Sequence, residues 1–162
     1  MIIRKVRDTD MDALVRIYNH YIESTTITFE EDLISSEIML ERVHNIQQSG
    51  FPWLVVEMDG QVQGYAYAGS WKPRSAYRYT VEPSIYLAPD IVAKGAGKAL
   101  YCKLLDTLKT QGIKNVLGVI ALPNQASVAL HESLGFKKVG EFARVGYKFE
   151  RWVSVGYWQL EW

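Results

Sequence analysis

The sequence predicts a mixed α/β fold in which one sheet carries helices on both faces. The first observation behind this prediction is that segments with helical apolar spacing alternate with short strand-like segments. The second is the composition, because 48% hydrophobic and 22% charged residues are typical of a chain with a buried core. The third is that no repeat, low-complexity stretch or linker interrupts the chain, so we expect a single domain over residues 1–162.

The N-terminal segments predict one strand followed by two helices. Residues 2–6 read as a short strand, and a helix opens directly after it at Asp8-Thr9. Asp12 stands three residues after Thr9, which is the position of a capping box. A second amphipathic helix begins at Ser35-Ser36, and Gly50 ends it.

Three strands are predicted next. Residues 53–57 form the first, and the Asp59-Gly60 hairpin turn leads into the second over residues 62–68. The third strand covers residues 79–87, after a polar, aromatic loop from Gly69 to Arg78. Because Pro83 in this strand cannot donate to a sheet ladder, we expect a bulge or a splayed edge there.

The remaining segments complete the order β-α-α-β-β-β-α-β-α-β-β. A helix with a leucine-rich stripe starts at Gly95-Ala96-Gly97 and ends at Gly112. A buried strand over residues 116–122 and a short helix over 124–134 follow it. The chain after Phe136 is mostly β, with a long aromatic-rich strand over residues 151–162.

The charge balance and the cysteine count exclude several classes of function. Lys plus Arg and Asp plus Glu are both 18, so we expect no nucleic-acid partner. One cysteine and three histidines supply neither an internal disulfide nor a zinc site, so no metal is expected. No apolar run approaches the length of a membrane span, and the first residues carry no signal region. We therefore expect no membrane partner and a cytoplasmic location.

The loop Lys94-Gly95-Ala96-Gly97-Lys98, between a strand and a helix, is a candidate anion site. Glycines let the backbone approach a phosphate, and the free N–H groups of the first helical turn point toward it. Val92 and Ala99 exclude a Walker A loop, and Leu100 excludes a dinucleotide fingerprint. A pyrophosphate cradle of the kind that suits coenzyme A remains, and so does a tight turn without a ligand.

These residues, with several other segments, resemble the GNAT acetyltransferase family, and within it the phosphinothricin and methionine sulfoximine N-acetyltransferase branch. The resemblance covers essentially the whole chain and rests on the order and spacing of the segments. They are Ile17–His20, Thr25–Phe29, Gly64–Ala66, Trp71–Arg74, Thr80–Leu87, Leu122–Ser127, His131–Phe136 and Gly156–Leu160. The resemblance implies the GNAT fold, a mixed and mostly antiparallel central sheet that is splayed at the cofactor site.

The resemblance implies acetyl-CoA as co-substrate, without a metal. Val92 departs from the family pattern, which has Gln or Arg at this position and thus one more side-chain contact to the pyrophosphate. A free backbone N–H near Leu87 is expected to polarise the acyl carbonyl. The implied cofactor-binding residues are Ile85, Tyr86, Leu87, Ala93, Lys94, Gly95, Ala96, Gly97, Lys98, Asn124 and Ser127.

Two side chains are implied to carry the chemistry. Glu82 matches the family's glutamate that takes the proton from the attacking amine, and His131 stands where the thiolate receives its proton. A strand-edge glutamate that faces solvent remains the alternative for Glu82. A buried structural histidine that is capped by a backbone carbonyl remains the alternative for His131.

The expected acceptor is a small amino acid or analogue, acetylated on its α-amino group. Three cations, Lys72, Arg74 and Arg78, favour an anionic acceptor. The complete substrate-binding set is Phe29, Glu30, Lys72, Pro73, Arg74, Arg78, Glu82, Pro83 and Ser84. Another amine acceptor (a polyamine, an aminoglycoside or a protein amine) and a non-catalytic acyl-CoA sensor remain alternatives. We also expect a homodimer, for which Trp152, Tyr157, Trp158 and Trp162 are candidate surface residues.

Overall fold

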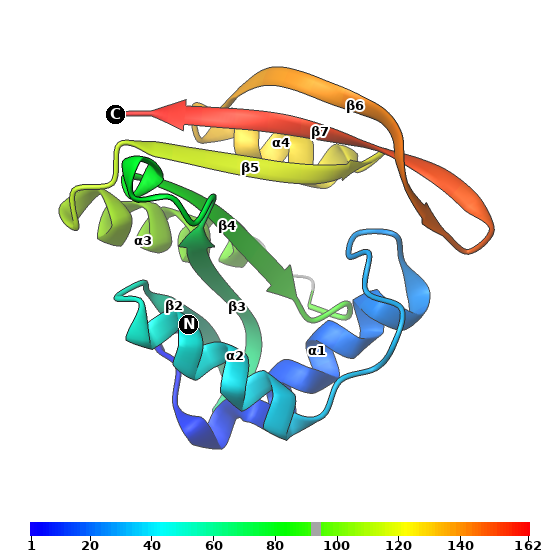
Figure 1. The fold of residues 1–162 in the computed structure, drawn as a ribbon. Coiled ribbons are helices and arrows are strands. Elements are labelled where there is room, and N and C mark those ends of the chain that lie inside the picture. Colours follow the sequence, from blue (N-terminus) through cyan, green and yellow to red (C-terminus); the bar gives the residue numbers. More distant parts are fainter. Residues whose placement is uncertain (92–94) are drawn as a thin grey trace.

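The computed structural model describes residues 1–91 and 95–162, and these build one seven-stranded sheet flanked by helices (Figure 1). The strand order across the sheet is β1-β2-β3-β4-β5-β7-β6. The β4–β5 pair is parallel, and the other neighbouring pairs are antiparallel. The predicted mixed, mostly antiparallel sheet is thus confirmed. The predicted cofactor contacts of Ala93 and Lys94, and the departure at Val92, lie outside the described residues.

The order of helices and strands agrees with the prediction, and only the boundaries move by a few residues. Short 3₁₀ turns lie at Asp8–Asp10 and Ser75–Tyr77. The elements are β1 (Ile2–Lys5), α1 (Met11–Ser24), α2 (Ser36–Gln48), β2 (Trp53–Met58), β3 (Gln61–Ser70), β4 (Thr80–Leu87), α3 (Ala96–Thr110), β5 (Asn115–Leu122), α4 (Gln125–Ser133), β6 (Lys137–Lys148) and β7 (Arg151–Glu161).

The start of the first helix differs from the prediction. A 3₁₀ turn precedes α1, and the capping box between Thr9 and Asp12 does not form. The carboxylate of Asp10 instead accepts a hydrogen bond from the backbone N–H of Arg7 at 2.8 Å. It also accepts two hydrogen bonds from the guanidinium of Arg4, at 2.8 and 2.9 Å. The local cap therefore lies at Arg7 and Asp10 and not at Thr9 and Asp12, and the ion pair with Arg4 joins the start of α1 to β1.

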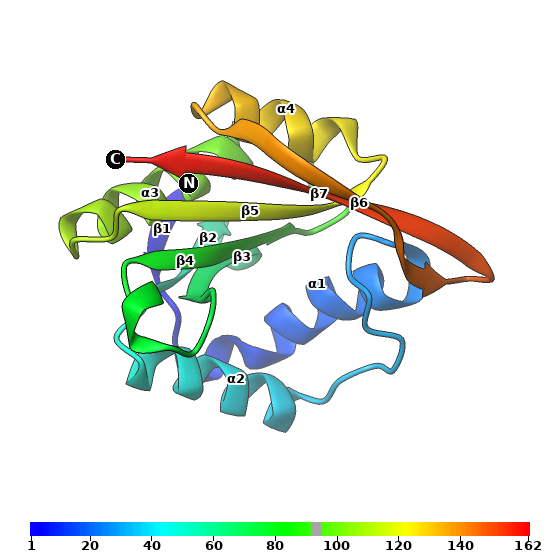
Figure 2. The ribbon, with the colours of Figure 1, turned by 45° about the horizontal axis from the view of Figure 1, so that its top comes forward.

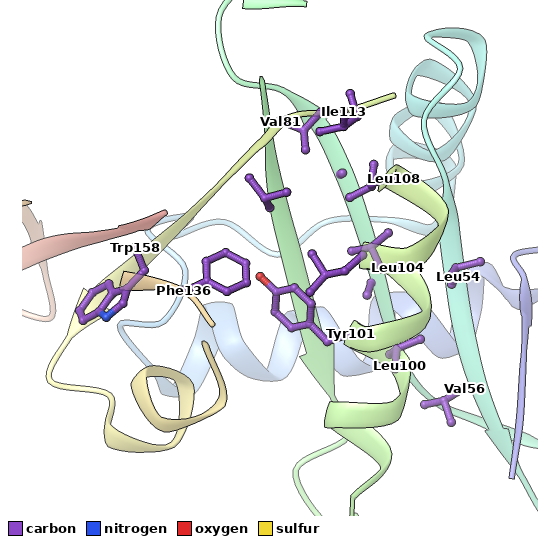
Figure 3. Packing of buried hydrophobic residues seen from close by; sticks show 14 of the residues in the cluster. Leu54, Val56, Val81, Leu100, Tyr101, Leu104, Leu108, Ile113, Phe136 and Trp158 are labelled. Atoms are coloured by element: carbon purple, nitrogen blue, oxygen red, sulfur yellow. The ribbon is translucent and has the colours of Figure 1, made fainter. Parts of the chain in front are cut away.

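Helices cover both faces of the sheet, and the strands supply each face by alternation (Figure 2). In β2, Leu54 and Val56 face the core under α3, whereas Trp53 and Val55 face the core under α1 and α2. The first core also receives one face of α3, from Leu100 to Leu108, with Tyr101 at the border of the cluster toward Phe136 (Figure 3).

The two edges of β4 behave differently. Its pairing with β3 is continuous from Ser70–Val81 to Gly64–Leu87, without a register shift. Its pairing with β5 ends after two residues, at Val81–Val116, and the strands then diverge (Figure 1). The predicted splayed edge is therefore present, on the β5 side of Pro83.

The alternation of hydrogen bonds explains why the sheet opens at this point. The backbone N–H of Ala88 donates to Gln63 at 2.8 Å, which marks these two residues as a hydrogen-bonded pair. Counting back from Ala88 in steps of two, Tyr86, Ser84 and Glu82 also direct their backbone polar groups toward β3. The residues between them, Leu87, Ile85 and Pro83, direct theirs toward β5. Since proline has no N–H to offer, the parallel ladder loses a donor at the residue where it would have to continue.

Candidate active site

A cavity of about 230 Å³ lies where β4 and β5 diverge. Its walls come from β4, β5, α3, α4, β7 and the segment after α1. The lining residues are Ile27, Thr28, Phe29, Glu82, Pro83, Ser84, Ile85, Tyr86, Tyr101, Val119, Ile120, Ala121, Asn124, Ser127, His131 and Val155. The cavity therefore brings together nine of the residues predicted from the sequence, and these lie between Phe29 and His131 in the chain.

Glu82 is the first residue of β4 beyond the last β4–β5 pair. Its side chain lines the cavity and remains in contact with solvent. Desolvation by the surrounding walls raises the pKa of Glu82 above its usual value, and the charge of Lys72 lowers it in part. A carboxylate with a raised pKa is a stronger base than an ordinary carboxylate.

The backbone of β4 offers hydrogen-bonding groups to the opening. The positions of Ile85 and Leu87 face the β5 side, where β4 has no strand partner in the part of the chain that the structure describes. The hydroxyl of Tyr21, from α1, donates to the carbonyl oxygen of Leu87. The N–H groups of Ile85 and Leu87 remain as donors along this open edge, on which successive residues are about 3.3 Å apart.

The N-terminus of α3 lies beside Leu87, the last residue of β4. Gly95 takes a left-handed conformation (φ 89°) as the N-cap, and no side chain among the described residues caps the helix. A Cβ atom on Gly95 would meet no described atom within 4 Å, whereas one on Gly97 would lie 2.9 Å from Leu87. Ala96 and Gly97 are buried in the first turn, and Lys98 is exposed. The N–H groups of such a helix N-terminus fit an anion such as a diphosphate.

His131, on α4, is 5% exposed, and both of its ring nitrogens have hydrogen-bond partners inside the protein. Its Nδ1 lies 2.8 Å from the carbonyl oxygen of Ser127. Because a carbonyl only accepts, Nδ1 carries the hydrogen, and Nε2 of the neutral ring accepts from the hydroxyl of Tyr101 at 2.8 Å. Burial lowers the pKa of His131, which keeps the ring neutral. A Cβ atom on Gly118 would lie 2.7 Å from this ring, so β5 needs a glycine there.

Sequence reasoning missed Tyr101 as a site residue. Its spacing on α3 matches the core leucines, and its ring is buried among them (Figure 3). Tyr101 nevertheless lines the cavity, and its hydroxyl is hydrogen-bonded to His131. The signal that could have found it is chemical, because a buried tyrosine needs a partner for its hydroxyl.

Asn124 is the N-cap of α4, and its side-chain oxygen accepts from the backbone N–H of Ser127 at 3.1 Å. Both residues line the cavity. Since the Asn124 oxygen is used by the cap, its amide NH₂ is the part that can serve a ligand.

The predicted substrate residues fall into two groups. Phe29 lines the cavity, but Glu30 does not, because it is paired with Arg42 at 2.5 and 2.8 Å and accepts from the hydroxyl of Tyr18. The Arg42 guanidinium, opposed in part by burial, holds the pKa of Glu30 below its usual value. The exposed residues Lys72, Pro73, Arg74 and Arg78 lie on the β3–β4 loop, outside the cavity wall.

Across residues 1–91 and 95–162, no helix is long and apolar enough to span a bilayer. In the same ranges, no three His, Cys, Asp or Glu side chains cluster in a way that could hold a metal ion.

The open strand edge, the helix N-terminus and the carboxylate beside them are features that suit an acyltransferase with a coenzyme A thioester as donor. Residues 3–155 match the model of the acetyltransferase (GNAT) domain, and the chain belongs to this family. It is an enzyme of the N-acetyltransferase type. The family and fold expected from the sequence are thus confirmed.

Curated relatives give the finer resemblance. A phosphinothricin N-acetyltransferase of Streptomyces viridochromogenes is 42% identical over 98% of this chain and 86% of its own length. An L-methionine sulfoximine/L-methionine sulfone acetyltransferase of Salmonella typhimurium is 35% identical over 99% of this chain and 94% of its own.

Solved structures agree with the fold. A ribosomal-protein-alanine N-acetyltransferase from Brucella melitensis superposes with a TM-score of 0.97 at 34% identity, over 100% of both chains. A GNAT superfamily phosphinothricin acetyltransferase from Sinorhizobium meliloti, in complex with acetyl-CoA, gives 0.95 at 34% identity, over 99% of this chain and 87% of its own. This complex supports acetyl-CoA as the co-substrate.

Proposed function

We propose that the enzyme transfers the acetyl group of acetyl-CoA to the α-amino group of a small amino acid or analogue of the phosphinothricin or methionine sulfoximine type. The observation that carries this proposal is Glu82, a carboxylate with a raised pKa at the point where the sheet opens. The activities named for the curated relatives support the acceptor class.

The proposed co-substrate lies along the open edge of β4. The diphosphate of acetyl-CoA binds the N-terminus of α3 at Gly95, and Lys98 adds a positive charge nearby. The pantetheine arm bonds the free backbone N–H groups of β4 and the amide of Asn124. Alignment of this kind lowers the entropic part of the barrier before any chemistry begins.

The transfer is direct in this proposal. The neutral amine attacks the thioester carbonyl carbon, and a backbone N–H near Leu87 stabilises the oxyanion that forms. The C–N bond forms, the C–S bond breaks, and Glu82 takes the proton of the amine, through a water molecule. The products are the amide and the coenzyme thiol.

The departing thiolate takes its proton from the Tyr101 hydroxyl, which gives up its hydrogen bond to Nε2 of His131 as the C–S bond breaks, and the proton held by Glu82 restores the hydroxyl through solvent. Before the transfer, the Tyr101 hydroxyl donates its single hydrogen to Nε2 of the neutral His131 ring, and both residues line the cavity. His131 thereby acts through Tyr101, which refines the role expected from the sequence.

The acceptor contacts Phe29 and the β4 residues beside Glu82, and its anionic group faces the exposed loop that carries Lys72, Arg74 and Arg78. Lys72 is close enough to affect the pKa of Glu82, which supports this loop as the neighbour of the reacting amine.

A protein amine is a second candidate acceptor, favoured by the name of the Brucella melitensis structure. Thiol release should be measured with methionine sulfone, phosphinothricin, spermidine and a peptide with N-terminal alanine. The proposal predicts the highest kcat/KM for the two amino-acid analogues. Turnover with the peptide alone would assign the enzyme to the second candidate, and turnover with spermidine alone would contradict both.

We also propose a homodimer formed through the β6–β7 hairpin. Large apolar side chains on this hairpin are exposed, namely Phe142, Val145, Tyr147 and Trp152. Trp158 from the predicted surface cluster is buried instead, at 2% exposure. Light scattering of the wild type should give twice the chain mass, and Trp152→Ser should shift the equilibrium toward the monomer.

A further inference from the structure

Lys148, the last residue of β6, is a buried cation that the proposed reaction does not use. Only 2% of its surface is exposed, which is rare for lysine. Its Nζ atom donates a hydrogen bond to the carbonyl oxygen of Thr28, 120 residues earlier, at 2.9 Å. Burial lowers the pKa of Lys148, and the carboxylates of Glu31 and Glu30 oppose this shift. The ammonium thus ties the segment after α1 to the far end of the sheet.

Gly146, two residues before Lys148, lies against Phe29, the residue that follows Thr28. A Cβ atom on Gly146 would lie 2.3 Å from the ring of Phe29, so the ring rests directly on the β6 backbone. Because side chains alternate along a strand, positions 146 and 148 share the inner face of β6, and both are buried. One strand face therefore fixes both the backbone of Thr28 and the side chain of Phe29.

The segment held in this way forms one wall of the cavity. Thr28 and Phe29 line it together with Glu82 and its β4 neighbours. The segment has a second anchor on α1, where the hydroxyls of Tyr18 and Thr28 lie 2.8 Å apart. Loss of the Lys148 contact would therefore free the wall without detaching the segment from the fold.

We infer that Lys148 is a positioning residue for the acceptor, which sets the place of the Thr28–Phe29 wall from β6. The inference rests on the proposed function, since it takes this cavity as the acceptor site. Lys148 does not touch the reacting atoms. Its effect is carried by the Thr28 carbonyl, and Gly146 provides the space that the Phe29 ring needs.

Lys148→Met tests the inference because methionine keeps the apolar length and removes the donor. The KM for the best acceptor of the panel should rise about tenfold, while the KM for acetyl-CoA stays within about twofold. Lys138→Met is the matched control, an exposed lysine of the same strand, and it should leave both constants unchanged. An equal rise in both KM values, or an unchanged acceptor KM, would overturn the inference.

Two further variants separate positioning from general damage. In a Phe29→Ala background, Lys148→Met should add little to the acceptor KM, because both changes act on one wall. Gly146→Ala keeps Lys148 and should displace the Phe29 ring, giving the same selective rise in acceptor KM. Additive effects of Phe29→Ala and Lys148→Met would contradict the inference.

Hydrogen exchange of the backbone at residues 27–30 supplies a readout that needs no acceptor. Exchange should be faster in Lys148→Met than in Lys138→Met. If exchange accelerates but the wild type acetylates no amino acid, the proposed function fails and the anchor stands. If exchange does not change, the anchor itself is wrong, whatever the acceptor proves to be.

Discussion

The two edges of β4 differ in how far they are paired. On the β3 side, seven consecutive residue pairs from Val81 to Leu87 stay in register. On the β5 side, only Thr80 and Val81 are paired, and the residues beyond them border the cavity. The closed edge satisfies its backbone groups within the fold and contributes stability, whereas the open edge leaves donors for a ligand. The same strand is thus closed on one edge and has unpaired backbone donors on the other, where its pairing with β5 ends.

The largest effect is expected from Glu82→Gln at the open edge. Loss of the general base should lower kcat/KM by about 10²–10⁴, which is roughly 3–5 kcal/mol of barrier. In the wild type, activity should fall as the pH drops through the raised pKa of Glu82, and the variant should lack this limb. A pH–rate profile from pH 4.5 to 9 measures both effects.

Stability separates this chemistry from folding. Because the native state raises the pKa of Glu82, the ionised carboxylate costs stability at neutral pH, so Glu82→Gln should melt at the same or a higher temperature. A lower melting temperature would mean that the loss of activity reflects damage to the fold.

A core residue on the β3 side of β4, away from the open edge, should affect stability and not catalysis. Leu54→Ala removes a side chain packed under α3, and the free energy of unfolding should fall by about 2–5 kcal/mol (Figure 3). The kcat/KM of the folded enzyme should stay within about threefold. Urea unfolding and steady-state kinetics at low temperature check the two halves of this prediction, and a large kinetic defect would remove the distinction between the edges.

Tyr101→Phe should have an intermediate effect, confined to catalysis. Removing the hydroxyl that His131 holds should lower kcat by about 10–10², or roughly 1.4–2.7 kcal/mol, with little change in either KM. Full activity of the variant would show that the leaving thiolate does not use this pair.

The smallest effect concerns His131 and pH. Its pKa is lowered in the native state, so the unfolded state binds more protons once the pH drops below about 6.5. The free energy of unfolding should therefore decline from pH 6.5 downward, by at most about 1.4 kcal/mol per pH unit from this group. Glu82 shifts the pH dependence of stability in the opposite sense, so the comparison is made in a Glu82→Gln background. In this background, the decline in the free energy of unfolding should be smaller with His131→Asn than with His131 intact. An equal slope in both proteins would exclude a lowered pKa.

Local signals explain what the sequence could predict. The Asp59-Gly60 turn has positive φ at both residues, as its composition requires, and the strand-to-helix turn at Gly95 forms where the glycines indicate. The splay beside Pro83 follows from one missing N–H. Each of these features depends on residues that are adjacent in the chain.

Contacts between distant segments explain what it could not predict. Glu30 pairs with Arg42 on the next helix and does not line the cavity, whereas the preceding residues Thr28 and Phe29 do. Tyr101 has the spacing of a core residue, and only its position opposite His131 reveals its hydroxyl as part of the site. Neither pairing leaves a mark in local spacing or propensity.

Amide hydrogen exchange of β4 with and without acetyl-CoA tests the open edge most directly. Saturating acetyl-CoA should slow the exchange of the Ile85 and Leu87 amides by at least about tenfold, because they become donors to the ligand. The amides of Ser84 and Tyr86, which already bond β3, should change little. Protection at Ser84 and Tyr86 with none at Ile85 and Leu87 would contradict the assignment of this edge to the co-substrate.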